Sequence, residues 1–318
     1  MTSASAPGKV ILFGEHAVVS GAAALGGAVD LRAKVTVEDL PGSLTISADD
    51  LILRGFSLDL VSGRIASAEA LNAVRYVRAA LQEFEARDLR VKIESEIPLA
   101  AGMGSSAAIV VATVAALNMH LGLALGTKDI AQISHMIEKK VQQGYGSPMD
   151  TALATFGGYL LVSTSVMPID LPALDIVVGY TGIPHDTRSE VEKVQSLLAR
   201  YPDIVAPIFQ AIGSISARSV PLIRDRKLLE LGELMNVNHG LLEAVGVGSR
   251  ELSELVYAAR GAGNAIGAKL TGAGGGGCMI ALPGPAGAEA LMVALRQAKG
   301  LAYSVKTGCE GMRMEVGK

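Results

Sequence analysis

The sequence predicts an α+β fold, and two features of its patterning lead to that prediction. Polar and apolar residues alternate in the runs 32–38 and 89–97, which is typical of half-buried strands in an antiparallel sheet. Segments with helical spacing interleave with such strands. Together these features favour an α+β arrangement over a doubly wound parallel sheet.

The first part of the chain is expected to alternate between strands and helices. Strands are expected at 3–13, 29–37, 44–48 and 89–97. Helices are expected at 66–86 and at 128–142. Between them, a glycine- and serine-rich loop should open a third helix, which runs to about Leu121. Gly144, Gly146 and Pro148 then break the chain before Asp150, and Gly157-Gly158 starts another strand.

The best candidate for a domain boundary is the segment 165–173, which contains Pro168 and Pro172. We therefore expect an N-terminal domain at 1–165 and a C-terminal domain at 166–318. In the second domain, helices should dominate from Thr187 to about Gly261. Strands are expected at 175–180, 265–271 and 278–282, and a final helix at 286–298.

Composition excludes several classes of protein. Half of the 318 residues are hydrophobic and 19% are charged, which argues against disorder. The net charge is -3 without a long basic run, so no nucleic-acid partner is expected. No apolar stretch is long enough to span a bilayer, and Cys278 and Cys309 are expected to be free thiols. We therefore expect a cytoplasmic protein without a membrane partner.

The central motif is the loop Gly102-Met103-Gly104-Ser105-Ser106 at the start of a helix. Glycines allow close backbone approach, and a helix start offers unpaired N–H groups and a positive dipole end. That combination favours a phosphate site. The alternative is an ordinary helix capped by serine after a flexible loop.

A second glycine run covers 271–277 and formally matches G-x-G-x-x-G at Gly272, Gly274 and Gly277. A dinucleotide-binding fold requires a helix after that motif. Here a strand-like run follows at 278–282, so the glycines are expected to form a turn between two strands.

Five further residues are candidates for chemistry. Lys9 lies in an apolar strand and needs a partner, which is either a structural ion pair or a site. Glu15 and His16 follow a glycine turn. Glu138 is either a solvated helix residue or, beside a phosphate loop, a metal ligand, and Asp150 follows the break in the chain.

Together these motifs resemble the GHMP (galactokinase, homoserine kinase, mevalonate kinase, phosphomevalonate kinase) superfamily. The resemblance rests on A-P-G-K-V-I-L-F-G-E-H at 6–16, P-L-A-A-G-M-G-S-S-A-A at 98–108 and K-L-T-G-A-G-G-G-G-C at 269–278. The continuation A-V-V at 17–19 and the segment 235–247 are similar to mevalonate kinases of the short archaeal type.

The resemblance implies a fold, an activity and a set of roles. The N-terminal part would be like ribosomal protein S5 domain 2 and the C-terminal part ferredoxin-like, with the site between them. ATP and Mg²⁺ would serve to phosphorylate (R)-mevalonate at its C5 hydroxyl, in isoprenoid precursor synthesis.

The implied roles fall on matching positions of this sequence. Asp150 and Lys9 would be catalytic, and Glu15 and His16 would lie near mevalonate. The loop Gly102, Met103, Gly104, Ser105 and Ser106 would cradle phosphate with Gly272 and Gly274 near it, and Ser106 and Glu138 would hold magnesium.

Some alternatives stay open. The acceptor could be phosphomevalonate or a sugar, and a non-catalytic binding protein would keep the fold but lose the charged positions. The oligomeric state is open, and a homodimer is one option. One residue more than the family's usual spacing separates Glu138 from Asp150, and the break at 142–148 can absorb it without moving Glu138.

Overall fold

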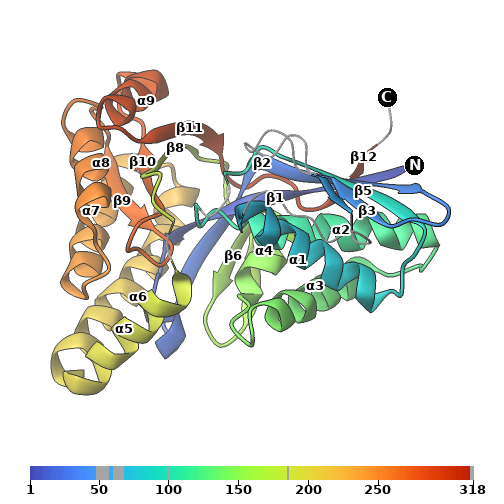
Figure 1. Ribbon diagram of the computed structural model, residues 1–318. Coiled ribbons are helices and arrows are strands. Elements are labelled where there is room, and N and C mark those ends of the chain that lie inside the picture. Colours follow the sequence, from blue (N-terminus) through green and yellow to red (C-terminus); the bar gives the residue numbers. More distant parts are fainter. Residues whose placement is uncertain (48–56, 60–67, 99–100, 185, 316–318) are drawn as a thin grey trace.

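The computed structural model describes residues 1–47, 57–59, 68–98, 101–184 and 186–315. Figure 1 shows two parts side by side, each made of a sheet and the helices packed on it. The larger part contains most of the first half of the chain, and the smaller part most of the second half.

Within the described residues, eight strands form the larger sheet, in the order β12-β1-β2-β5-β3-β4, with β6 pairing with β2 and β7. Their bounds are β1 (Thr2–Phe13), β2 (Ala24–Asp39), β3 (Thr45–Ser47), β4 (Ser57–Asp59), β5 (Leu89–Ser95), β6 (Tyr159–Val162), β7 (Val166–Ile169) and β12 (Arg313–Glu315). All neighbours pair antiparallel except β3 and β5, which are parallel.

One face of this sheet is covered by helices. They are α1 (Ala68–Glu83), α2 (Ser105–Leu121), α3 (Thr127–Val141) and α4 (Pro148–Phe156). The most buried is α2, whose residues from Ala107 to Leu117 are all buried. It contacts both β1 and β2, so it fixes the position of the loop that precedes it.

The smaller part has four described strands in the order β11-β8-β10-β9, all antiparallel. They are β8 (Asp175–Tyr180), β9 (Gly267–Thr271), β10 (Cys278–Leu282) and β11 (Leu301–Lys306). Its helices are α5 (Thr187–Arg200), α6 (Pro202–Arg224), α7 (Leu228–Ala244), α8 (Arg250–Arg260) and α9 (Gly287–Gln297). The α+β prediction is thus confirmed.

Some elements differ from the sequence-based expectations. The expected strand at 29–37 begins earlier, at Ala24, because buried residues continue the pairing with β1 and β6. Helix α4 lies where no element was expected. Ala48 and residues 66–67 of the expected elements fall outside the described residues.

The chain crosses between the two parts more than once. The strand β7 pairs with β6, although it begins at the boundary that the sequence indicates, and the late strand β12 pairs with β1. The part of the chain after β11 therefore returns to the larger sheet.

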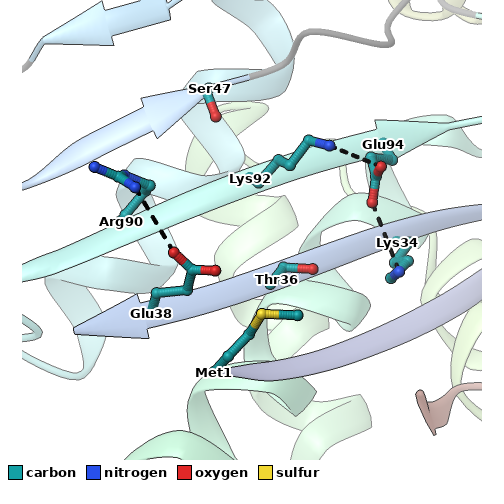
Figure 2. A pocket seen from close by; sticks show the side chains of 8 residues that line it. All are labelled: Met1, Lys34, Thr36, Glu38, Ser47, Arg90, Lys92 and Glu94. Carbon is teal, nitrogen blue, oxygen red and sulfur yellow. Dashed lines mark hydrogen bonds and ion pairs between the residues drawn. The ribbon is translucent and has the colours of Figure 1, made fainter. Parts of the chain in front are cut away.

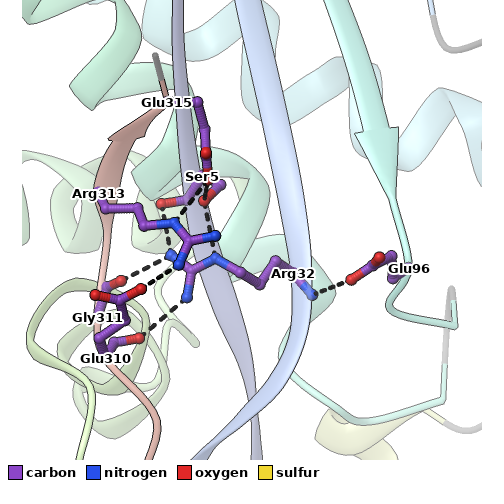
Figure 3. Close-up of polar contacts among 7 residues, drawn as sticks. All are labelled: Ser5, Arg32, Glu96, Glu310, Gly311, Arg313 and Glu315. Carbon is purple, nitrogen blue, oxygen red and sulfur yellow. Dashed lines mark hydrogen bonds and ion pairs between the residues drawn. The ribbon is translucent and has the colours of Figure 1, made fainter. Parts of the chain in front are cut away.

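Arg32 on β2 holds this returning segment, as Figure 3 shows. Its guanidinium donates hydrogen bonds to the carbonyl oxygens of Glu310 (3.1 Å) and Gly311 (2.7 Å) and to Ser5 Oγ (2.8 Å). The same segment contacts the end of α4, because the Met312 N–H donates to Thr155 O over 3.0 Å. The C-terminal segment thereby secures α4.

In the part of the chain that the structure describes, no helix combines the length and hydrophobicity needed to cross a membrane.

Candidate active site

Lys9 and Asp150 meet between β1 and α4. The Lys9 Nζ lies 3.2 Å from Asp150 Oδ2, and both side chains are largely buried. The backbone N–H of Lys9 donates to Met103 O over 2.9 Å. A Cβ on Gly104 would lie 2.7 Å from Lys9 Cγ, so this glycine is what allows the loop 102–106 to approach the lysine.

Helix α4 presents Asp150 in its first turn. Ser147 caps the helix, Pro148 occupies its first position, and the Asp150 N–H donates to Ser147 Oγ over 3.4 Å. The Ser147 hydroxyl in turn donates to Asp150 Oδ1 over 2.9 Å. Sequence reasoning missed this helix, although the serine-proline pair followed by an acidic residue is a helix-start signal.

Glu138 lies late in α3 and is 1% exposed. Its Oε1 accepts hydrogen bonds from Ser106 Oγ and from Gln142 Nε2, each over 3.3 Å. Its Oε2 is buried and has no hydrogen-bond partner among the described residues. Burial raises the pKa of this carboxyl to about 8, helped by the nearby charge of Asp150 and opposed by Ser106 and Lys9.

Between Glu138 and Asp150, the backbone becomes irregular only after the end of α3. Helix α3 continues through Glu138 to Val141, and the irregular backbone follows, with φ of 54° at Gln143 and 104° at Gly144. Lys139 is exposed while Glu138 is buried, so the lysine points elsewhere, as predicted.

The loop 102–106 has the geometry of a helix-start anion site. Gly102 and Gly104 have φ of 78° and 72°, and α2 begins at Ser105. The Ala108 N–H bonds to Gly104 O over 3.0 Å, and the N–H groups before it in the helix point out of its first turn. Ser105 Oγ is buried without a hydrogen-bond partner among the described residues, whereas the side chain of Met103 belongs to the core.

The second glycine run forms the turn between β9 and β10, which confirms the expected strand–turn–strand. The Gly275 N–H donates to Val247 O over 2.9 Å, and a Cβ on Gly274 would lie 2.1 Å from that same oxygen. Gly272 instead borders open space. Of the two glycines expected near phosphate, Gly274 is in contact with Val247 and Gly272 is free to face a ligand.

Glu15 and His16 lie in the turn after β1 and are both buried. Glu15 Oε1 pairs with Lys269 Nζ, and Glu15 Oε2 accepts from Asn238 Nδ2 over 3.4 Å. His16 Nε2 lies 2.8 Å from Ala273 O in the glycine turn. Burial lowers the pKa of His16. Sequence reasoning did not identify Lys269 or Asn238 as partners, because both are far from Glu15 in the chain.

The structure thus brings the predicted residues together in two groups. Lys9, Asp150, Glu138 and Ser106 form one group at the start of α2. His16 and the glycine turn form the other. Strand β1 connects the groups, because Thr271 Oγ1 donates to Ile11 O over 2.8 Å and accepts from Ile11 N–H over 3.1 Å.

A cavity of about 580 Å³ lies elsewhere, on the outer face of the larger sheet. Figure 2 shows its lining, where Lys34 pairs with Glu94 and Arg90 with Glu38. It includes none of the residues predicted for the site, and its charges of both signs are paired with one another.

Both parts of the chain match models of one kinase family. The GHMP kinases N terminal domain matches residues 69–158, and the GHMP kinases C terminal domain matches residues 219–300. The fold and the loop before α2 therefore have the organisation of a GHMP kinase.

Full-length relatives narrow the assignment. The mevalonate kinase of Pyrococcus horikoshii is 42% identical over 328 residues, covering 98% of this chain and 97% of the relative. The crystal structure of L. major mevalonate kinase in complex with R-mevalonate superposes with a TM-score of 0.82 at 26% identity, covering 96% of each chain. The Methanococcus jannaschii mevalonate kinase gives 0.81 at 26% identity, covering 96% of this chain and 98% of that one. The chain belongs to the mevalonate kinase family of the GHMP kinases.

Proposed function

We propose that this chain transfers the γ-phosphoryl group of ATP to the C5 hydroxyl of (R)-mevalonate, giving 5-phosphomevalonate and ADP. The main support for this proposal is the Lys9–Asp150 pair near the start of α2. It places an acid–base group and a cation beside the loop 102–106, which would bind phosphate. Similarity to mevalonate kinases over nearly the full chain supports mevalonate as the acceptor.

The residues of the first group would divide the work as follows. Asp150 orients the C5 hydroxyl and takes its proton as the oxygen bonds to the γ-phosphorus and the bond to the ADP oxygen breaks. Lys9 stabilises negative charge on Asp150 and on the attacking oxygen. The N–H groups at the start of α2 and the Ser105 hydroxyl hold phosphate oxygens.

The residues present fit a magnesium ion. Glu138 Oε2 is a buried carboxylate oxygen without a partner among the described residues. Ser106 Oγ donates a hydrogen bond to the other oxygen of the same carboxylate. Magnesium is usually held by one or two carboxylates together with substrate phosphates and water. Ser106 and Glu138 would hold the ion, which would supply charge neutralisation on the transferring phosphates.

Within the second group, the histidine would face the acceptor. Both oxygens of Glu15 already have protein partners, whereas His16 Nδ1 has none among the described residues. Of the two residues that the sequence assigns to mevalonate, we therefore propose that His16 makes the contact and that Glu15 supports it.

An ADP-release assay with a panel of acceptors tests the choice of substrate. The purified protein should release ADP with (R)-mevalonate and Mg²⁺-ATP, and not with galactose, homoserine or phosphomevalonate. Faster turnover with any of the other three would overturn the acceptor and leave the family assignment intact. No ADP release with any acceptor would overturn the activity itself.

A further inference from the structure

A buried ion pair joins the two parts of the molecule beside the second group of site residues. Lys269 on β9 of the smaller sheet is 0% exposed, and Glu15 in the turn after β1 is 1% exposed. A charge pair so completely removed from water costs a large desolvation energy, which good geometry and further hydrogen bonds must offset.

Those further contacts are present. Lys269 Nζ donates to Leu270 O over 2.7 Å and lies 5.9 Å from the centre of the Phe13 ring. Asn238 on α7 donates to the second oxygen of Glu15 over 3.4 Å. The carboxylate is held from two elements of the smaller part, so the turn 14–16 cannot move independently of β9 and α7.

The next residue along the turn is His16, which has φ of 61°. Its Nε2 lies 2.8 Å from Ala273 O, and a carbonyl oxygen can only accept, so Nε2 carries the proton in the neutral ring. The other nitrogen, Nδ1, is then an acceptor, and it is buried without a partner among the described residues. The orientation of the ring depends on the position of the turn that Glu15 fixes.

We propose that Lys269 is a positioning residue: through its ion pair with Glu15 it fixes the ring orientation and tautomer of His16, and so governs acceptor binding without contacting the acceptor. The effect on binding rests on the proposed function, in which His16 faces mevalonate. The effect on the His16 ring does not, and can be measured without any substrate.

Stability and positioning can be separated with one pair of variants. Lys269→Met alone leaves the Glu15 carboxylate buried and unpaired, which is strongly destabilising. Glu15→Met combined with Lys269→Met replaces the whole pair by apolar side chains of similar length, which is often neutral for stability. The double variant should therefore unfold within a few degrees of the wild type.

The double variant tests the proposal in two ways. We expect the KM for mevalonate to rise about tenfold or more, as when a bound group is misplaced, while the KM for ATP stays within about twofold. We also expect ¹⁵N NMR of labelled histidine to show His16 as the Nε2–H tautomer in the wild type and as a tautomer mixture in the variant.

A surface pair provides the control. Lys306 and Asp175 pair across β11 and β8 and are both exposed, so Lys306→Met with Asp175→Asn should change neither readout. If the folded Glu15/Lys269 double variant keeps wild-type His16 signals and a wild-type KM for mevalonate, the pair has only a structural role and the proposal is overturned. If the wild type does not phosphorylate mevalonate, the His16 signals alone decide the proposal, and the proposed function fails separately.

Discussion

The two oxygens of Asp150 have different neighbours, and that asymmetry suits a group that takes a proton. Oδ1 accepts a hydrogen bond from Ser147, which fixes the plane of the carboxylate. Oδ2 faces the Lys9 ammonium at 3.2 Å. An acceptor hydroxyl approaching Lys9 would therefore meet a carboxylate that is already oriented.

Replacing Asp150 by asparagine tests that role. Asp150→Asn should lower kcat by roughly two to four orders of magnitude, because a positioned acid–base group is lost, while the KM for ATP changes little. Asp203→Asn is a matched control, since Asp203 also lies in the first turn of a helix that begins with proline. Steady-state kinetics check both, and an Asp150→Asn enzyme that keeps more than about a tenth of kcat would remove Asp150 from the chemistry.

The Glu138 carboxyl gives a prediction about metal and pH. With its pKa raised to about 8, the group is mostly protonated at pH 6 in the nucleotide-free protein, and a cation binds the ionised form. The magnesium concentration for half-maximal rate should therefore fall as the pH rises from 6 to 8.

Glu138→Gln should raise that magnesium concentration, lower kcat and flatten its pH dependence. Glu94→Gln, on the outer face of the larger sheet, should do none of these. Magnesium titrations at several pH values check this. A titration that is the same in Glu138→Gln and wild type would mean that the ligand lies elsewhere.

At the scale of elements, α4 depends on its first turn. Ser147 both caps the helix and orients Asp150, so one side chain couples helix stability to the site. Ser147→Ala should reduce the free energy of unfolding by about 1 kcal/mol, the usual cost of losing an N-cap, and should also lower kcat. Denaturant unfolding and kinetics measure the two effects. A loss of stability with unchanged kcat would show that Asp150 needs no help from Ser147.

The glycine turn between β9 and β10 can be tested where it borders open space. Gly272→Ala adds a Cβ that meets nothing within 4 Å, at a φ of +84° that costs an ordinary residue about 1 kcal/mol. It should raise the KM for ATP and leave the protein folded.

Gly274 is less suitable for that test, because its Cβ would overlap Val247 O. Gly274→Ala should therefore lower the melting temperature much more than Gly272→Ala. If folded Gly272→Ala keeps an unchanged KM for ATP, the glycine turn does not contribute to ATP binding.

Local signals predicted some of these elements well and others not at all. Reading the sequence placed α2 and α3 and the strands β8 and β10 almost at their observed ends, because each is an apolar or amphipathic run bounded by glycine or proline. It missed α4, whose nine residues lie between a glycine-rich break and Gly157. A short helix gives too few turns for a periodic pattern to stand out.

At the scale of the whole molecule, the two parts meet in several places, and one of these contacts is a buried seam. Strand β1 contributes Lys9 to the first group of site residues and leads into the turn with Glu15 and His16 beside β9, where Ile11 bonds to Thr271. A more exposed contact lies between α5 and the turn after α3, where the Arg188 guanidinium lies 4.5 Å from the centre of the Tyr145 ring. The buried seam is the better anchored of these two contacts.

The sequence motifs were sufficient for the family and the first group of residues, but not for the long-range partners. The place of Lys9 in an apolar strand indicated that it needs a partner, and the family resemblance supplied Asp150. The partner of Glu15 could not be found, because Lys269 lies 254 residues away and only the packing of β9 on the turn brings it near. The return of β12 to β1 depends on Arg32 contacts with backbone carbonyls, which leave no pattern in the sequence.

The central claim is that this site moves a phosphoryl group from ATP to the C5 oxygen of mevalonate. The most direct test is to identify the product by ³¹P NMR and mass spectrometry while ADP is measured in the same reaction. The account predicts one 5-phosphomevalonate for each ADP, and no ADP above background when mevalonate is omitted. ADP with inorganic phosphate and no phosphorylated mevalonate would contradict it.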